Sequence, residues 1–162
     1  MVNFHKPHVY VLPEDRANRQ MADAFRLEIE FTQSRQMMVL PKAGGWPKVF
    51  KLFKSVHIRE MEACRDRYMI LLIDFDCKWE ERINRARSDI IPAHLTDRVF
   101  ILGAWKEPED LMRANLGTFE EIGKAMARDC RDGTDNIWMH ELLRHNASEL
   151  DRLREHVRPI LF

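Results

Sequence analysis

The sequence predicts an α/β domain in which a four-stranded, mainly parallel sheet carries helices on both faces, with extra helices at the C-terminal end. Two observations predict this architecture. Short apolar segments alternate along the chain with longer segments whose apolar residues recur every three or four positions. One short segment, residues 68–73, is an uninterrupted apolar run between charged residues, as expected for a strand buried on both faces. Alternating strands and helices favour a parallel sheet covered by helices.

The first half of the chain is expected to contain two strands and two helices. Residues 8–12 form the first strand, and Pro13, Glu14 and Asp15 suit the first turn of the helix that follows. Apolar residues at helical spacing mark that helix, namely Met21, Ala24, Phe25 and Ile29. Residues 36–40 form the second strand, which ends in the glycine-containing turn 41–45. Pro47 opens the next helix, which continues or restarts as far as about residue 65.

The second half is expected to contain two more strands and four helices. The strand 68–73 is followed by a charged helix over 78–87, and residues 98–102 form the fourth strand. Pro108 opens a helix that Gly117 ends. Thr118 and Glu121 have the spacing of a capping box for the next helix, which ends at Gly133. The last helix spans about residues 136–158, with the apolar stripe Met139, Leu142, Leu143, Leu150, Leu153 and Val157 as core or as a dimer face.

The composition favours a protein of the cytoplasm. A chain of 162 residues suffices for one domain with a sizeable core. Its 26 acidic and 26 basic residues cancel, so net charge neither indicates nor excludes nucleic acid as a partner. No apolar run approaches the roughly 18 residues of a membrane span, and the N-terminus lacks an apolar signal core. Three widely spaced cysteines, Cys64, Cys77 and Cys130, suggest neither a disulfide framework nor a zinc site.

Acidic residues follow three of the predicted strands. Glu14 follows the first strand, Asp74 and Asp76 follow the third, and Glu107 and Glu109 come shortly after the fourth. Parallel α/β sheets bind ligands at the carboxyl ends of their strands. In extended backbone, residues two apart point the same way, so Asp74 and Asp76 are expected to face one spot, where a cation would neutralise them. A small number of hard oxygen ligands suits Mg²⁺ or Mn²⁺ better than zinc.

Three stretches, in this order, resemble the Toprim domain of topoisomerases, primases and overcoming-lysogenization-defect family nucleases. They are VYVLPE at residues 9–14, VLPKAGG at 39–45 with the helix after it, and ILLIDFD at 70–76. The resemblance covers residues 8–116 and is closest to small bacterial nuclease-type members, in which an acidic helix start follows the fourth strand. It implies a Rossmann-like fold, with residues 117–162 as C-terminal helices packed on the same domain.

The resemblance also implies a function, metal-dependent hydrolysis of a phosphodiester in DNA or RNA. Asp74 and Asp76 would hold Mg²⁺ or Mn²⁺ against a phosphate, and Glu14 would bind metal or act as general base or acid. Glu107 or Glu109 could hold a second ion. The lysines that cluster around the Gly-Gly turn, Lys42 and Lys48 among them, are candidates for contacting the nucleic acid, and a solvated helix face is the alternative. A partner ATPase or another protein, and a homodimer, are further expectations.

Several alternatives stay open on the residues alone. Asp15 and Cys77 stand near positions where the family usually has glycine, so a non-catalytic Toprim-like module that binds nucleic acid or a partner is one alternative. Asp-x-Asp after an apolar strand also occurs in haloacid-dehalogenase-type phosphatases, and a receiver-like domain would need a fifth strand that the sequence does not indicate. Packing is favoured over base stacking for Trp46, Trp79 and Trp105, and no ligand role is expected for His140 or His145.

Overall fold

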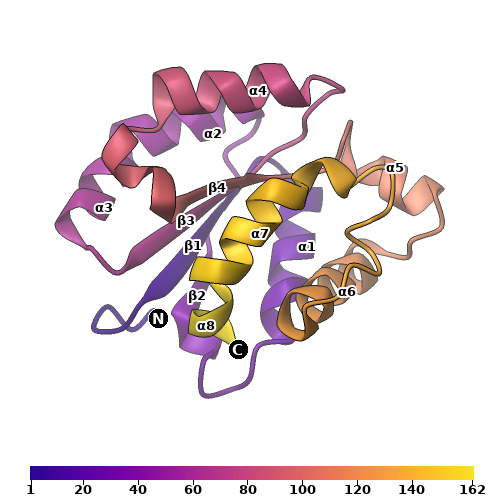
Figure 1. Cartoon of the computed structure of the whole chain (residues 1–162), viewed down its shortest axis with the longest axis horizontal. Helices are drawn as coiled ribbons and strands as arrows, with labels where there is room; N and C mark the ends of the chain where they lie inside the picture. Colours follow the sequence, from indigo (N-terminus) through magenta and orange to yellow (C-terminus); the bar gives the residue numbers. More distant parts are fainter.

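The structure is a computed structural model that describes residues 1–162, and its four strands form a single parallel sheet in the order β2-β1-β3-β4 (Figure 1). The strands are β1 (His8–Pro13), β2 (Met37–Val39), β3 (Arg67–Leu72) and β4 (Val99–Leu102). Val9 lies opposite both Met37 of β2 and Tyr68 of β3, which fixes the register. The predicted α/β fold with a parallel sheet and additional C-terminal helices is therefore confirmed.

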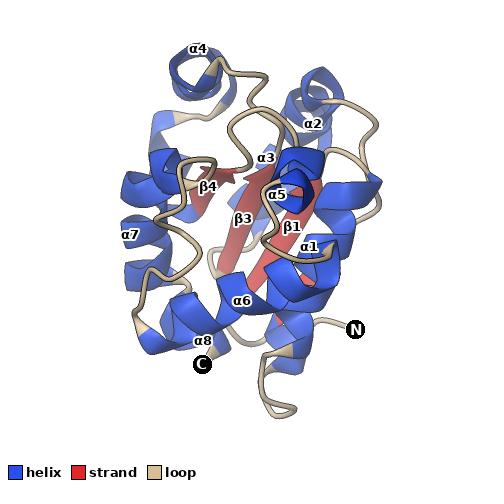
Figure 2. Cartoon of the chain, turned by 90° about the vertical axis from the view of Figure 1, so that its right-hand side faces the viewer, coloured by secondary structure: helices blue, strands red, loops and turns tan.

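Helices cover both faces of this sheet (Figures 1 and 2). One face carries α2 (Trp46–Leu52), α3 (Ile58–Ala63) and α4 (Trp79–Arg85). The other carries α1 (Arg16–Leu27), α6 (Phe119–Asp132), α7 (Ala147–His156) and α8 (Arg158–Leu161), while α5 (Pro108–Arg113) follows β4. A π-helical segment joins α2 to α3, and another extends α4. No helix is both long enough and apolar enough to cross a bilayer.

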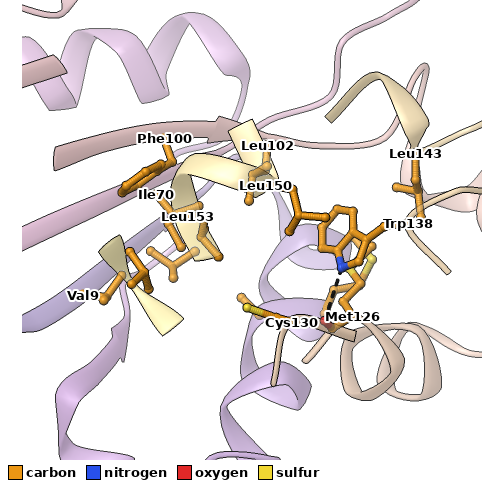
Figure 3. Close-up of a cluster of buried hydrophobic side chains, with 14 of the residues drawn as sticks. Val9, Ile70, Phe100, Leu102, Met126, Cys130, Trp138, Leu143, Leu150 and Leu153 are labelled. Carbon is orange, nitrogen blue, oxygen red and sulfur yellow. Dashed lines mark hydrogen bonds between the residues drawn. The ribbon is translucent and has the colours of Figure 1, made fainter. Parts of the chain in front are cut away.

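The strand side chains belong to two separate hydrophobic cores, one on each face of the sheet, because successive strand residues point to opposite sides. Val9, Val11 and Ile70 join the larger cluster of 21 buried residues under α1, α6 and α7. Tyr10 and Leu12 join the smaller cluster of 16 residues under α2 and α3. Figure 3 shows the larger cluster, in which the indole Nε1 of Trp138 donates to the Met126 carbonyl at 3.3 Å. Strands buried on both faces explain the apolar run of β3.

Side chains of α7 and the turn before it cap the free edge of β4, where a fifth strand would otherwise pair. Asn146 Oδ1 accepts from the Gly103 N–H at 3.1 Å, and its Nδ2 donates to the Gly103 carbonyl at 2.9 Å. Glu149 Oε2 accepts from the Ile101 N–H at 3.1 Å, and Arg152 donates to the Val99 carbonyl. These bonds satisfy the outward backbone groups of an edge strand and end the sheet at four strands. The receiver-like alternative requires a fifth strand, and this sheet has four.

The helix α6 has the ends that its sequence predicts and packs closely on α1. Thr118 and Glu121 form both bonds of the capping box, and Gly133 closes the helix with φ +69°. Gly123 faces α1 so closely that a Cβ added there would stand 2.2 Å from the Met21 carbonyl oxygen. A side chain at this position would push the two helices apart, so glycine is what permits their close approach.

Three predicted helix boundaries were wrong. The single helix expected over 136–158 is replaced by turns, after which α7 begins at Ala147, and Met139 is 63% exposed. The physical reason is Asp129, whose carboxylate accepts from the Ile137 N–H at 2.7 Å and also binds Thr134, holding this stretch in a turn. Pro13 and Glu14 do not begin α1, because Pro13 still belongs to β1 and Asp15 is the N-cap. The helix α5 ends at Arg113, before Gly117.

Candidate metal centre at the switch point of the sheet

The site lies at the point where the strand order reverses. From β1 the chain steps to β2 on one side and then to β3 on the other, so the loops after β1 and β3 diverge. Such a switch point leaves a crevice at the carboxyl ends of the two strands, where α/β folds bind ligands. Glu14 follows β1 directly, and Asp74 follows β3 by two residues. Both therefore stand where the topology places a ligand.

Glu14 and Asp74 are in contact across this crevice. The ladder between β1 and β3 continues to Glu14, whose N–H donates to the Leu72 carbonyl at 2.9 Å. The Glu14 side chain then turns towards β3, and its Oε2 accepts from the Asp74 N–H at 2.6 Å. Convergence of these two acids at one sheet edge, which the sequence predicts, is therefore present.

Asn18 joins the acids into one network. Asp15 caps α1 by accepting from the Asn18 N–H at 2.9 Å, and its Oδ1 also accepts from Asn18 Nδ2 at 3.1 Å. The same Nδ2 donates to Asp74 Oδ1 at 2.8 Å. Asn18 is completely buried, and its Oδ1 accepts no hydrogen bond. Asn18 was not among the residues predicted for the site, although an acid three residues before an asparagine at a helix start is a capping signal visible in the sequence.

Burial and mutual repulsion make these carboxyls unusually weak acids. Burial raises the pKa of Asp74 to about 7, and repulsion from Glu14, Asp15 and Asp76 adds to this, against the lowering effect of the Asn18 hydrogen bond. Burial also raises the pKa of Glu14, although backbone N–H groups of Asp74 and Trp46 oppose the shift. An acid cluster of this kind favours binding of a cation, which would stabilise the ionised forms.

Asp76 is oriented differently from the expectation for extended backbone. The chain leaves the extended conformation after Phe75, because Asp76 and Cys77 adopt positive φ values of 50° and 62°. The Asp76 side chain is 51% exposed, and its Oδ2 accepts from Arg82 at 2.8 Å. The Arg82 guanidinium is buried and lies 3.7 Å from the ring centre of Trp46. Asp76 thus already has a cationic partner, and no sequence signal singled out Arg82 for this position.

The acids after β4 lie beside this loop, but their side chains have other partners. The Asp76 N–H donates to the Lys106 carbonyl at 3.2 Å, which brings the start of α5 next to the Asp-x-Asp loop. The Glu107 carboxylate pairs with Arg113 at 2.9 Å, and Glu109, in the first turn of α5, makes no ion pair. No three His, Cys, Asp or Glu side chains are arranged as a closed metal site. The structure therefore brings together Glu14 and Asp74, with Asp76 at the rim and Glu107 turned to Arg113.

Of the two candidate lysines, Lys42 lies in the glycine turn next to Glu14, and Lys48 lies in the first turn of α2, which follows it. The Gly44 N–H donates to the Glu14 carbonyl at 2.7 Å, and the φ of Gly44 is +91°, which a residue with a side chain rarely adopts. Lys42 and Lys48 are both exposed. The ammonium of Lys48 lies near Gly44, at 3.7 Å from where a Cβ would stand. Both lysines are therefore placed beside the carboxylate site and open to solvent.

Comparison of the chain with protein-family models, with curated proteins and with solved structures finds no match.

Proposed function

We propose that the chain is a Mg²⁺- or Mn²⁺-dependent hydrolase of phosphodiester bonds in DNA or RNA, of the Toprim type. The observation that carries this proposal is the contact between Glu14 and the buried Asp74 at the switch point, where the pKa of Asp74 is raised to about 7. A phosphodiester is itself negative, so carboxylates at a reacting centre need cations to accept it. The acids and the fold together support a metal-assisted reaction on a phosphate.

The residues present fit a magnesium-type ion. Mg²⁺ usually takes only one or two protein carboxylates and completes its shell with water and substrate phosphate oxygens. Glu14 and Asp74 supply two carboxylates, and the buried Asn18 Oδ1 is an oxygen without a hydrogen bond beside them. All three are hard oxygen donors, which Mg²⁺ and Mn²⁺ prefer. Asp76 and either Glu107 or Glu109 would serve a second ion, for which Asp76 would leave Arg82 and Glu107 would leave Arg113.

The residues of the site would then have the following roles. Glu14 and Asp74 would hold the ion, and Asn18 would fix the orientation of Asp74 through its 2.8 Å hydrogen bond. A bound ion supplies charge neutralisation at the phosphate and lowers the pKa of an attacking water. Glu14, whose pKa burial already raises, is suited to take up the proton from that water. Lys42 and Lys48 would contact backbone phosphates and position the strand.

The direct test is cleavage of linear and circular DNA and of RNA with Mn²⁺, using purified protein alone and with candidate partner ATPases. We expect salt-sensitive cleavage that EDTA abolishes and that Glu14→Ala reduces at least a hundredfold, because the variant lacks a proposed metal ligand. The matched control is Glu30→Ala, which removes an exposed acid outside the site. Equal cleavage by Glu14→Ala would indicate a contaminant or another mechanism, and inactivity on every substrate would refute the hydrolase.

One observation favours a second candidate, a non-catalytic module that binds nucleic acid or a partner protein. Arg82 already neutralises Asp76 at 2.8 Å, and the acids do not form a closed three-ligand group. Such a module would bind nucleic acid without cutting it. Release of phosphate from small monoesters would instead support the haloacid-dehalogenase-type phosphatase.

A further inference from the structure

A hollow lined by aromatic rings lies beside the Asp-x-Asp loop. Its lining residues are Trp79, Trp105, Glu141, Leu142, Arg144 and His145, and we call it the aromatic hollow. The Trp105 N–H donates to the Leu142 carbonyl at 3.0 Å, which ties its two walls together. Its residues come from the start of α4, the loop after β4 and the turns before α7. Only the tertiary structure brings these three segments together.

Aromatic groups in the hollow surround one imidazole. The His145 ring lies 5.3 Å from the Trp105 ring and 6.3 Å from the Trp79 ring, centre to centre. Its other side contacts Phe75 at 5.3 Å, the residue between Asp74 and Asp76. Trp105 is 36% exposed, so part of its indole is open to a ligand in the hollow. An aromatic ring that is open to solvent can stack on a flat ligand.

The hollow also has charged residues at its surface. Arg144 and Glu141 line it and are exposed, and the exposed Lys106 lies next to Trp105. Two ring atoms of its aromatic side chains are buried without a hydrogen-bond partner, the Trp79 Nε1–H and the His145 Nδ1, whose ring donates from Nε2 to the Gly103 carbonyl at 2.8 Å. A flat heterocycle that carries a phosphate group complements the rings and the two cations, with Glu141 as the one acidic group.

Backbone hydrogen bonds join the hollow to the carboxylate site. The Cys77 N–H donates to the Trp105 carbonyl at 2.8 Å, and Asp76 bonds to the neighbouring Lys106. The segment from Asp74 to Asp76 therefore belongs to the carboxylate site and also borders the aromatic hollow, where Phe75 packs against His145. The hollow therefore lies next to the loop that carries the acids, so a nucleic acid bound at the carboxylate site would pass near it.

We propose that the aromatic hollow stacks an unpaired base, so that the substrate is a single-stranded nucleic acid or a single-stranded segment of one. This inference rests on the proposed function only in taking nucleic acid as the ligand of the neighbouring site. Bases within a duplex are stacked on each other and cannot present a face to Trp105, whereas every unpaired base can. The stacking contact tolerates any sequence and adds to the phosphate contacts of the lysines.

The test measures binding in EDTA, where no metal-dependent cleavage occurs. Anisotropy of a labelled oligothymidylate, of an oligouridylate and of a matched DNA duplex gives three affinities for each variant. We expect the wild type to prefer the single strands, and Trp105→Ala to weaken single-strand binding about tenfold with little effect on the duplex. Trp105→Phe keeps an aromatic face and should recover most of the loss. Phe31→Ala, which removes an exposed ring on another loop, should bind as the wild type does.

Equal single-strand affinity for the wild type and Trp105→Ala, or a wild-type preference for the duplex, would overturn the inference. Circular dichroism of each variant separates loss of binding from loss of folding. The outcome is independent of the hydrolase proposal. Single-strand binding without cleavage in Mn²⁺ would refute the hydrolase proposal and support base stacking in the aromatic hollow. Cleavage of a duplex without single-strand preference would support the hydrolase proposal and refute base stacking.

Discussion

Replacing Asp74 with asparagine should stabilise the metal-free protein at neutral and alkaline pH. The folded protein holds Asp74 at a pKa of about 7, against an ordinary value of 3.8. At about 1.4 kcal/mol per pKa unit, ionisation of this buried group costs the folded state up to about 4 kcal/mol. Asparagine has nearly the same shape, keeps an oxygen to accept from Asn18 and carries no charge. The variant therefore avoids the cost.

The pH dependence follows from the direction of the shift. Below pH 3.8 the carboxyl is protonated in both states and contributes nothing. Between pH 3.8 and about 7 the unfolded chain has released the proton while the folded protein keeps it, so the free energy of unfolding falls as pH rises. Above pH 7 the whole cost is present. The stability advantage of Asp74→Asn should thus grow by about 2.5 kcal/mol between pH 5 and pH 8.

Urea unfolding in EDTA at pH 5 and pH 8 measures this advantage, with the exposed acid Asp151 changed to asparagine as the matched control. Added Mn²⁺ should stabilise the wild type by an amount that rises with the logarithm of its concentration above the Kd, and should leave Asp74→Asn unchanged. A stability difference that is the same at both pH values would refute the raised pKa. Undiminished Mn²⁺ affinity of the variant in calorimetry would refute Asp74 as a ligand.

Two further predictions concern the partners of the site and of the sheet edge. Arg82→Gln frees Asp76 from its ion pair and should tighten Mn²⁺ binding about fivefold in calorimetry. The control Arg85→Gln, whose arginine only approaches the Trp46 ring at 5.2 Å, should leave the affinity unchanged. Unchanged affinity in both variants would mean that Arg82 does not compete with the metal. Asn146→Ala leaves the Gly103 N–H without its acceptor and should lower the free energy of unfolding by about 1–3 kcal/mol in urea. The control is Ser148→Ala, which changes an exposed residue at the start of α7. An equal effect of the two substitutions would contradict the role of Asn146 at the sheet edge.

Much of the architecture is encoded locally. The apolar run 68–73 predicts a strand buried on both faces, and β3 occupies Arg67–Leu72 in the middle of the sheet. Thr118 and Glu121 predict a capping box because the two bonds depend only on residues three apart, and both bonds are present. The prediction of one helix over 136–158 was wrong because this stretch depends on a residue outside it. Its apolar spacing is helical, but Asp129, several residues earlier, takes the N–H of Ile137 and holds a turn.

The sequence by itself determined that Glu14 and Asp74 meet, whereas the tertiary structure decided that Asp76 and Glu107 turn to arginines instead. Glu14 and Asp74 each follow an apolar strand, and parallel strands end at one edge, so their convergence follows from order along the chain. The buried link through Asn18 and the pairing of Asp76 with Arg82 depend on side chains that only the folded packing orients. The same holds for the aromatic hollow, because Trp79, Trp105 and His145 belong to three separate segments whose spacing along the chain carries no periodic signal.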